Sequence, residues 1–530
     1  MRSPPAGVTA AGPARKTERM AATLYRGGRI YSPADPRASA LLVDGDRIAW
    51  LGAIEDAPPC DEVVDLDGAL VTPAFVDAHV HATNTGVSLL CLDLAEATSV
   101  TDLLDRVASY AQTLPADATL LGHGWDESGW PQRRHPTAAE LDSAGGGRKV
   151  YLSRADVHSA ASSSALMAAV SGLVREPGYR DDGWQRRAAH HGVRGAAYAS
   201  LTDRQRRDAQ RETLRRAAAN GIAAVHECGG PGTSSEQDFT ALLALPAAEP
   251  LPEVYGYWGE LGAAAKAREL GAVGAGGDLY ADGALGSQTA CLSQPYHDTD
   301  SSGYAYLDAE QVAEHLVDCG GHGVQGGFHA IGDAAIAAVV QGFAQAAEKI
   351  GVDRVRAARH RVEHAEILNR DLIRGFVEFG IVASMQPAFD RLWGGEDKMY
   401  ALRLGVDRSL ASNPFGSLAG VGVPLAFGSD SPVTPIDPWG SVRAAAQHHN
   451  PAERIGVKAG FAAHTRGGWR AVRRDDEGVL VPGGPATFAV WNPVGELTAG
   501  LPALRPGDPL PTCVRTVLRG TTIYQKDGAT

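Results

Sequence analysis

The segment VDAHVH places two histidines two positions apart in an apolar stretch. Side chains two apart on a β-strand point to the same face, so His79 and His81 can converge on one metal ion. Three more candidates end later apolar segments: His329 in GGFHAIGD, His364 in RVEHAE and Asp430 in LAFGSD. Imidazole nitrogens and a carboxylate suit zinc, iron or a similar divalent ion. We expect these five side chains to bind a metal, although the first two histidines alone could simply cap a strand.

These residues end copies of a repeated unit, in which a short apolar segment runs into a polar or glycine-rich cluster and an Ala-rich helical stretch follows. Eight such strands alternating with helices predict an α/β fold, a (β/α)₈ TIM-like barrel. The polar residues then gather at the carboxyl ends of the strands, where barrel active sites lie. The expected strands are 74–81, 221–227, 253–258, 277–283, 326–333, 361–366, 381–387 and 425–430.

The flanks of the barrel have a different character. Residues 20–73 and 471–530 contain short strands broken by turn residues, so we expect one composite β-sandwich built from both termini. The barrel then occupies 74–470. Its first two strands are too far apart for one crossover helix, so 84–215 is expected to be an inserted lid or substrate subdomain over the barrel mouth. Residues 1–19 are small, polar and Pro-rich, which is typical of a disordered tail or of a stretch upstream of a true start at Met20, with a transit peptide as the less favoured alternative.

Composition narrows the function. The chain has 530 residues and a net charge of -13, which argues against nucleic acid or an anionic membrane as a partner. Six cysteines without CxxC spacing fit reduced thiols in the cytoplasm. No run approaches the ~18 apolar residues of a membrane span, and the N-terminus has no signal-peptide core. A small-molecule substrate is therefore expected.

Several motifs together resemble a known family. VTPAFVDAHVH, FHAIGD, RVEHAEI and GSDSPV resemble the amidohydrolase superfamily. The long insertion with GWD and RADVHSA, together with YADGALGSQTA and PVTPIDPW, resembles the amidohydrolase family 3 branch, typified by N-substituted formamide deformylase. The similarity runs from about residue 23 to the end of the chain.

The resemblance implies a metal-dependent hydrolase of a non-peptide C–N bond, in an N-substituted amide, a formamide or a cyclic amide. It implies metal-activated water, with Asp430 as general base and proton donor to the leaving nitrogen. His364 would help to polarise the substrate carbonyl. Zinc is the expected metal, and a homodimer would fit the family.

One position departs from the family pattern. Many members carry a carboxylated lysine that bridges two metals in the fourth strand, and Asp278 occupies that position here. An aspartate is three methylenes shorter, so it cannot span the same distance unless the backbone moves inward. We expect one ion on His79, His81, His329 and Asp430. Alternatively, Asp278 reaches a second ion directly or through water, or is an ordinary buried carboxylate bonded to a histidine or arginine.

Weaker candidates come from the insertion and the second strand. By resemblance, the segment SRADVHS reaches the pocket, and the tryptophan of GHGWDESGW could form its wall, although both could serve only structural roles. The expected substrate-binding residues are Asp156, His158, Trp125 and Asp126. The residues expected to orient the metal ligands are His226 and Glu227.

Two rival functions share these residues. A barrel that lost its metals could act as a binding or assembly protein. The absence of the bridging lysine is the observation that favours this rival function. Against this, the other five ligand positions are all present. A hydrolase of esters or carbamates would use the same site, since fold does not fix the bond that is cleaved.

Overall fold

A computed structural model describes residues 21–154, 159–231, 233–492 and 495–527. The expected tail and the candidates Asp156 and His158 lie outside the described residues. No helix in the described part of the chain combines the length and the apolar character that a bilayer crossing requires.

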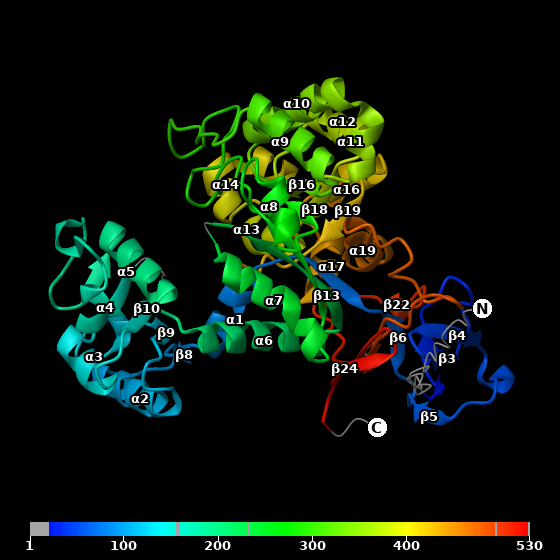
Figure 1. Cartoon of the computed structure of the whole chain (residues 1–530), viewed down its shortest axis with the longest axis horizontal. Helices are drawn as coiled ribbons and strands as arrows, with labels where there is room; N and C mark the ends of the chain where they lie inside the picture. The colour runs from blue at the N-terminus through cyan, green and yellow to red at the C-terminus, as the bar shows by residue number, and fades with distance from the viewer. Residues whose placement is uncertain (1–20, 155–158, 232, 493–494, 528–530) are drawn as a thin grey trace, which may run out of the picture.

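The centre of the molecule is a sheet of eight parallel strands that lie side by side in chain order (Figure 1). The first strand meets the chain just after the last, because the amide of His81 donates to the carbonyl of Ser431 at 2.9 Å. This contact nearly closes the sheet, and the predicted barrel is confirmed. The strands are β7 (Phe75–Val80), β13 (Ile222–Gly229), β14 (Glu253–Trp258), β15 (Gly274–Ala275), β16 (Gln325–Ala330), β17 (Arg361–His364), β18 (Val382–Met385) and β19 (Leu425–Phe427).

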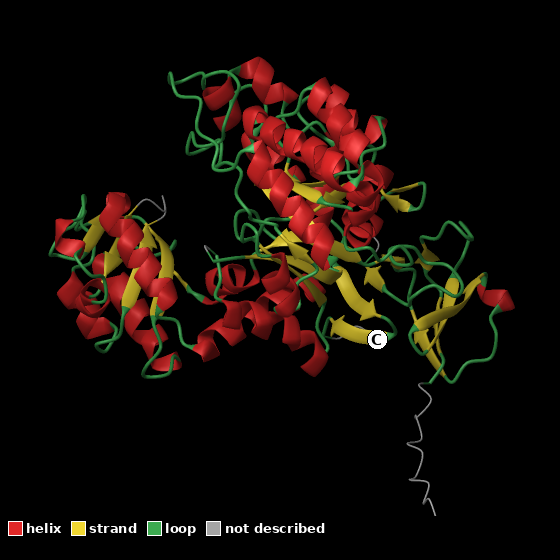
Figure 2. Ribbon diagram, turned by 45° about the horizontal axis from the view of Figure 1, so that its top comes forward, coloured by secondary structure: helices red, strands yellow, loops and turns green. Residues whose placement is uncertain are grey.

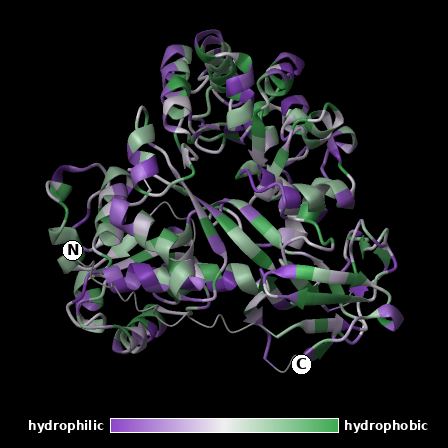
Figure 3. Ribbon diagram, turned by 45° about the vertical axis from the view of Figure 1, so that its right-hand side comes forward, coloured by the Kyte–Doolittle hydropathy of each residue, from purple (hydrophilic) through white to green (hydrophobic). Residues whose placement is uncertain are grey.

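Helices surround this sheet. Figure 3 shows them coloured both hydrophilic and hydrophobic, as expected for helices with one exposed and one buried face. In α12, for example, Leu372, Ile373, Phe376 and Phe379 are buried. The helices are α1 (Ala82–Leu90), α6 (Asp203–Ala219), α7 (Glu236–Ala248), α8 (Ala264–Glu269), α9 (Ala309–His322), α10 (Asp333–Ile350), α11 (Val352–Ala358), α12 (Arg370–Phe379), α13 (Pro387–Trp393), α14 (Met399–Leu404), α15 (Val406–Ala411), α16 (Phe415–Gly420), α17 (Pro438–Ala446), α18 (Val457–Ala462) and α19 (Gly468–Ala471).

The fourth strand differs from its prediction. The sequence predicts a strand over 277–283, whereas the strand is Gly274–Ala275 and the residues that follow are irregular. The cause is the glycine pair after the strand, because Gly276 has φ 151° and Gly277 has φ 74°, values that L side chains rarely adopt. Asp278 therefore lies in a loop that leaves the strand.

Two sheets from the chain ends lie beside the barrel. A five-stranded sheet joins strands from both termini, and a core cluster containing Tyr25, Val71 and Phe488 packs it against a four-stranded sheet. The four-stranded sheet contains β4 (Arg47–Gly52), β3 (Ala40–Asp44), β1 (Thr23–Arg26) and β5 (Glu62–Asp65). The five-stranded sheet contains β2 (Arg29–Ile30), β6 (Leu70–Pro73), β20 (Phe488–Trp491), β23 (Cys513–Leu518) and β24 (Thr521–Gln525). A short hairpin adds β21 (Leu497–Thr498) and β22 (Leu501–Pro502).

The insertion after β7 has a sheet and a core of its own. Its strands, in sheet order, are β12 (Trp184–Arg186), β11 (Ser159–Ser162), β10 (Val150–Arg154), β9 (Leu120–Trp125) and β8 (Leu92–Asp93). Its helices are α2 (Val100–Thr113), α3 (Ala138–Ala144), α4 (Ser164–Ala168) and α5 (Arg187–Ala199). In Figures 1 and 2 this body lies beside the barrel. The predicted range 84–215 also includes parts of α1 and α6, which pack against each other. The lid role stays a prediction.

Candidate metal centre

The two histidines of β7 each have one ring nitrogen fixed by an acceptor. The Nδ1 atom of His79 lies 2.9 Å from an oxygen of Glu363, and the Nδ1 atom of His81 lies 3.0 Å from the carbonyl oxygen of Cys228. An ionised carboxylate and a carbonyl only accept hydrogen bonds, so both Nδ1 atoms carry the proton. Each Nε2 atom therefore points to the carboxylates of Asp278 and Asp430, which raise the pKa values of both histidines against the effect of burial, and it is the atom that would bind a metal once its proton is lost.

The histidines of β16 and β17 have the same arrangement. The Nε2 atom of His329 lies 3.2 Å from the carbonyl oxygen of Gly283, and the Nδ1 atom of His364 lies 2.8 Å from the side-chain oxygen of Gln386. This leaves Nδ1 of His329 and Nε2 of His364 available. With the two histidines of β7, the structure brings all four predicted histidines to one end of the barrel with one nitrogen each free of these partners.

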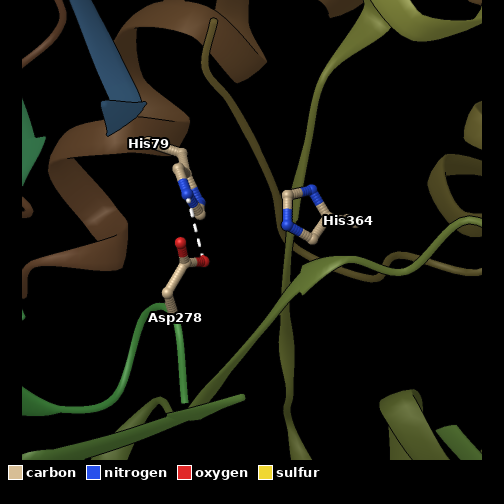
Figure 4. Close-up of side chains that lie close together, drawn as sticks. All are labelled: His79, Asp278 and His364. Atoms are coloured by element: carbon tan, nitrogen blue, oxygen red, sulfur yellow. Dashed lines mark ion pairs between the residues drawn. The ribbon is translucent and has the colours of Figure 1, made fainter. Parts of the chain in front are cut away.

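Two carboxylates lie among these nitrogens. The Nε2 atom of His79 is 3.4 Å from oxygens of both Asp278 and Asp430, and the Nε2 atom of His81 is 3.2 Å from both. Ligand atoms bound tetrahedrally at about 2.0 Å from a metal lie about 3.3 Å apart. The spacing is that of ligands to a shared ion, and the ligand atoms of His79, His81 and Asp430 all lie within 4.8 Å of one another. His364 adjoins the same atoms, because it shares a group within 4.8 Å with His79 and Asp278 (Figure 4).

Unpaired buried atoms support the same fit. Among the described residues, Nε2 of His79 and Oδ1 of Asp278 are buried without a hydrogen bond, and they face each other only as an ion pair at 3.4 Å. An unsatisfied polar atom costs about 1–3 kcal/mol, so two of them a few ångströms apart call for a ligand. A divalent ion would satisfy both at once.

The glycine pair explains how a short side chain reaches this centre. A Cβ atom on Gly276 would lie 2.3 Å from the amide nitrogen of Gly327, and one on Gly277 would lie 2.9 Å from the sulfur of Cys228. Only glycine permits so close an approach to the neighbouring strands. The backbone thus comes inward before Asp278, whose carboxylate also accepts a hydrogen bond from the hydroxyl of Tyr280 at 3.1 Å.

The charges of the site agree with metal binding. Burial would raise the pKa of Asp278, but His79 and His81 together hold that pKa well below its ordinary value. Burial opposes the same effect at Asp430, where His79 and His81 lower the pKa. Burial and the charge of nearby His329 lower the pKa of His364 to about 4. Both carboxylates are therefore ionised at neutral pH, and His364 is neutral.

Two of these residues have unusual backbones. His364 has φ 69° and Asp430 has φ 54°, in the left-handed region that costs non-glycine residues roughly 1–2 kcal/mol. His364 is the last residue of β17, and Asp430 lies three residues after the end of β19. Strain of this kind is concentrated at functional sites, since the turn aims the side chain.

A buried ion pair beneath the site was not predicted. Arg361 is fully buried, and its guanidinium donates to both oxygens of Glu363 and to the carbonyl of Ala78. Glu363 in turn holds His79. The motif RVE could have indicated this ion pair. Arg361 and Glu363 are two positions apart on a buried strand, so their side chains share a face and their opposite charges can neutralise each other.

The predicted supporting residues have identifiable contacts. The Nδ1 atom of His226 lies 3.0 Å from the guanidinium of Arg361, and Glu227 accepts a hydrogen bond from the amide of Ala82 at 2.7 Å. Burial raises the pKa of Glu227 to about 7. Glu227 thus holds the first turn of α1, directly after His81, and His226 contacts the ion pair behind His79.

The predicted wall residues belong to the insertion. Trp125 is fully buried in the insertion's own core, where its indole nitrogen donates to the carbonyl of Leu152 at 2.9 Å. Asp126 pairs with Arg154 at 2.8 Å. The structure does not bring these two residues to the metal-ligand cluster. Their role in substrate binding stays a prediction.

The fold is a parallel β/α barrel, and histidines and aspartates gather at the carboxyl ends of its strands. This arrangement is that of a metal-dependent hydrolase. The model of the amidohydrolase family matches residues 62–524, so the chain belongs to the amidohydrolase family. The protein is therefore a hydrolase acting on carbon–nitrogen bonds other than peptide bonds, as the sequence predicted.

Individual relatives agree with this family. YtcJ of Bacillus subtilis (strain 168) is 27% identical over 95% of this chain and 99% of its own length. The N-substituted formamide deformylase of Arthrobacter pascens is 29% identical over 24% of this chain and 25% of its own. A crystal structure of an uncharacterized metal-dependent hydrolase from Pyrococcus furiosus shares the fold, with a TM-score of 0.73, 24% identity and coverage of 88% of this chain and 98% of the other.

Proposed function

We propose that this protein hydrolyses a non-peptide C–N bond of a small molecule, an N-substituted amide, formamide or cyclic amide, with one divalent ion per chain. The observation that carries the proposal is the spacing of 3.2–3.4 Å between the Nε2 atoms of His79 and His81 and the oxygens of Asp278 and Asp430. These four residues would hold the ion. Zinc is the metal that we propose, since it favours four nitrogen and oxygen ligands.

This ligand set differs from the one expected from the sequence. The sequence predicts His329 as a ligand, but its Nδ1 atom lies 3.8 Å from Oδ1 of Asp278, further than the 3.2–3.4 Å between the histidines of β7 and the two aspartates. Asp278 takes its place, since the inward turn at the two glycines carries its carboxylate to the histidines of β7. We propose that His329 and His364 line the substrate side of the centre.

The side chains then divide the reaction between them. A divalent ion held by His79, His81, Asp278 and Asp430 would lower the pKa of a bound water molecule and polarise the substrate carbonyl. Asp430, ionised beside His79 and His81, accepts the proton of the attacking water and later delivers it to the leaving nitrogen. Neutral His364, held by Gln386, orients the carbonyl side of the substrate. Glu363 fixes His79 throughout and takes up no proton, since Arg361 and His79 keep its pKa low against the effect of burial.

Two further features support this proposal. The Arthrobacter pascens relative is an N-substituted formamide deformylase, and it is similar to 24% of this chain. The six cysteines are all free thiols. Free thiols fit a reducing compartment such as the cytoplasm, where we propose that the protein acts.

The test is a substrate screen with and without metal. Purified protein is assayed against matched N-substituted formamides, acetamides, lactams, esters and carbamates, before and after a chelator, and again after zinc is restored. We expect hydrolysis of at least one formamide, amide or lactam, lost with the chelator and recovered with zinc. Hydrolysis of esters or carbamates alone would move the protein to that rival class. Metal-bound protein with no hydrolysis at all would favour a binding function.

A further inference from the structure

A cavity of about 740 Å³ adjoins the metal centre, and nothing in the reaction proposed above uses it. One wall follows the metal ligands in the chain, with Thr83 two residues after His81 and Pro432 two residues after Asp430. The opposite wall is the helix α5 of the insertion, which contributes Arg194 and Tyr198. The volume lies within the 300–1,000 Å³ that small-molecule sites usually have.

The cavity carries a surplus of positive charge. Arg206 and Asp238 line it and form an ion pair at 2.8 Å, so they neutralise each other. Arg194 is exposed into the same space, and none of the described acidic side chains pairs with it. Its guanidinium lies 5.9 Å from the centre of the ring of Tyr198. In a chain with a net charge of -13, an arginine left without a carboxylate at the mouth of the barrel attracts an anion.

Uncharged residues on the barrel side line the same space. Asn84 lines the cavity in the first turn of α1, and Thr233 and Ser235 line it from the segment before α7. The positive end of the α1 dipole lies there as well. The guanidinium of Arg194 on α5, the amide of Asn84 and the amino end of α1 can then hold a carboxylate from two sides of the cavity.

We propose that this cavity binds the end of the substrate remote from the bond that is cleaved, and that this end carries a carboxylate paired with Arg194. The inference rests on the proposed function for the position of the reacting bond. On this proposal, the insertion determines substrate specificity through the residues of α5. The preferred substrate is then an acid-bearing amide or formamide whose carboxylate lies across the cavity from the metal centre.

The first test compares two substrates that differ only at the remote end. An N-formyl ω-amino acid, five methylenes long, is assayed beside its terminal carboxamide, with the wild type, Arg194→Gln and Arg204→Gln. Arg204 is an exposed arginine of α6 outside this cavity and serves as the matched control. We expect Arg194→Gln to lower kcat/KM for the acid ten- to a hundred-fold and for the carboxamide less than two-fold. Arg204→Gln should change neither.

The second test measures binding without hydrolysis. Isothermal titration of the metal-loaded protein with glutarate is compared with 1,5-diaminopentane, a cation of the same length. We expect glutarate to bind the wild type at least ten-fold more tightly than Arg194→Gln, and the diamine not to bind. Glutarate binding that needs Arg194, without hydrolysis of any amide, would keep this inference and reject the proposed reaction. Equal hydrolysis of both substrates, unchanged in Arg194→Gln, would overturn the inference and leave the reaction intact.

Discussion

Replacing Asp430 by asparagine is expected to lower kcat by about 10³-fold or more while the barrel stays folded, since general base catalysis alone contributes roughly 10²–10⁴. The amide keeps the size of the side chain but cannot accept the proton of the attacking water. It also removes one negative charge from the group around His79 and His81. The measurement is kcat on the best substrate of the screen, together with circular dichroism to establish the fold.

The control for this variant is Asp353→Asn, which changes an exposed aspartate in the first turn of α11. It should retain full activity. Metal content is measured on both variants, because a variant that simply loses its metal would be rescued by excess zinc, whereas loss of the base would not. Full activity in Asp430→Asn would contradict its role as base.

Replacing Arg361 by methionine is expected to lower the free energy of unfolding by about 3–5 kcal/mol, because it leaves the carboxylate of Glu363 buried without its partner. Both side chains are fully buried, and the guanidinium also donates to Ala78 and Ser384. Since Glu363 orients His79, metal affinity should fall as well, by roughly 10–100-fold. Urea denaturation of the metal-free protein and zinc titration measure the two effects separately.

Arg359→Met is the matched control, two residues away in the chain. Its guanidinium pairs with Asp475 at the surface, so its loss should cost less than about 1 kcal/mol and leave zinc affinity unchanged. If Arg361→Met were as stable as this control, the ion pair could not be what holds Glu363 and His79 in place.

The sequence predicted the barrel and the residues of the centre because both leave local signals. Seven of the eight expected strands overlap those of the structure, since buried parallel strands appear as short apolar runs between helices. His79 and His81 were found from their spacing of two. His329, His364 and Asp430 were found because each ends such a run.

The features that the sequence did not predict depend on tertiary contacts, which a pattern along the chain does not contain. The fourth strand was misplaced because Gly276 and Gly277 adopt positive φ next to β16, a tertiary approach that the sequence alone does not reveal. For the same reason the reach of Asp278 could not be judged. The pairing of Arg361 with Glu363 would have required the register of β17, and the place of the insertion beside the barrel depends on the packing of α1 against α6.

The central claim is that Asp278, in place of a bridging lysine, completes a site for one divalent ion with His79, His81 and Asp430. The most direct measurement is the metal-to-protein ratio of the purified chain after expression with added zinc, for the wild type and Asp278→Ala. We predict about one ion per chain for the wild type, and a marked loss in the variant. Two ions per chain, or none, or a ratio unchanged in Asp278→Ala, would contradict this assignment.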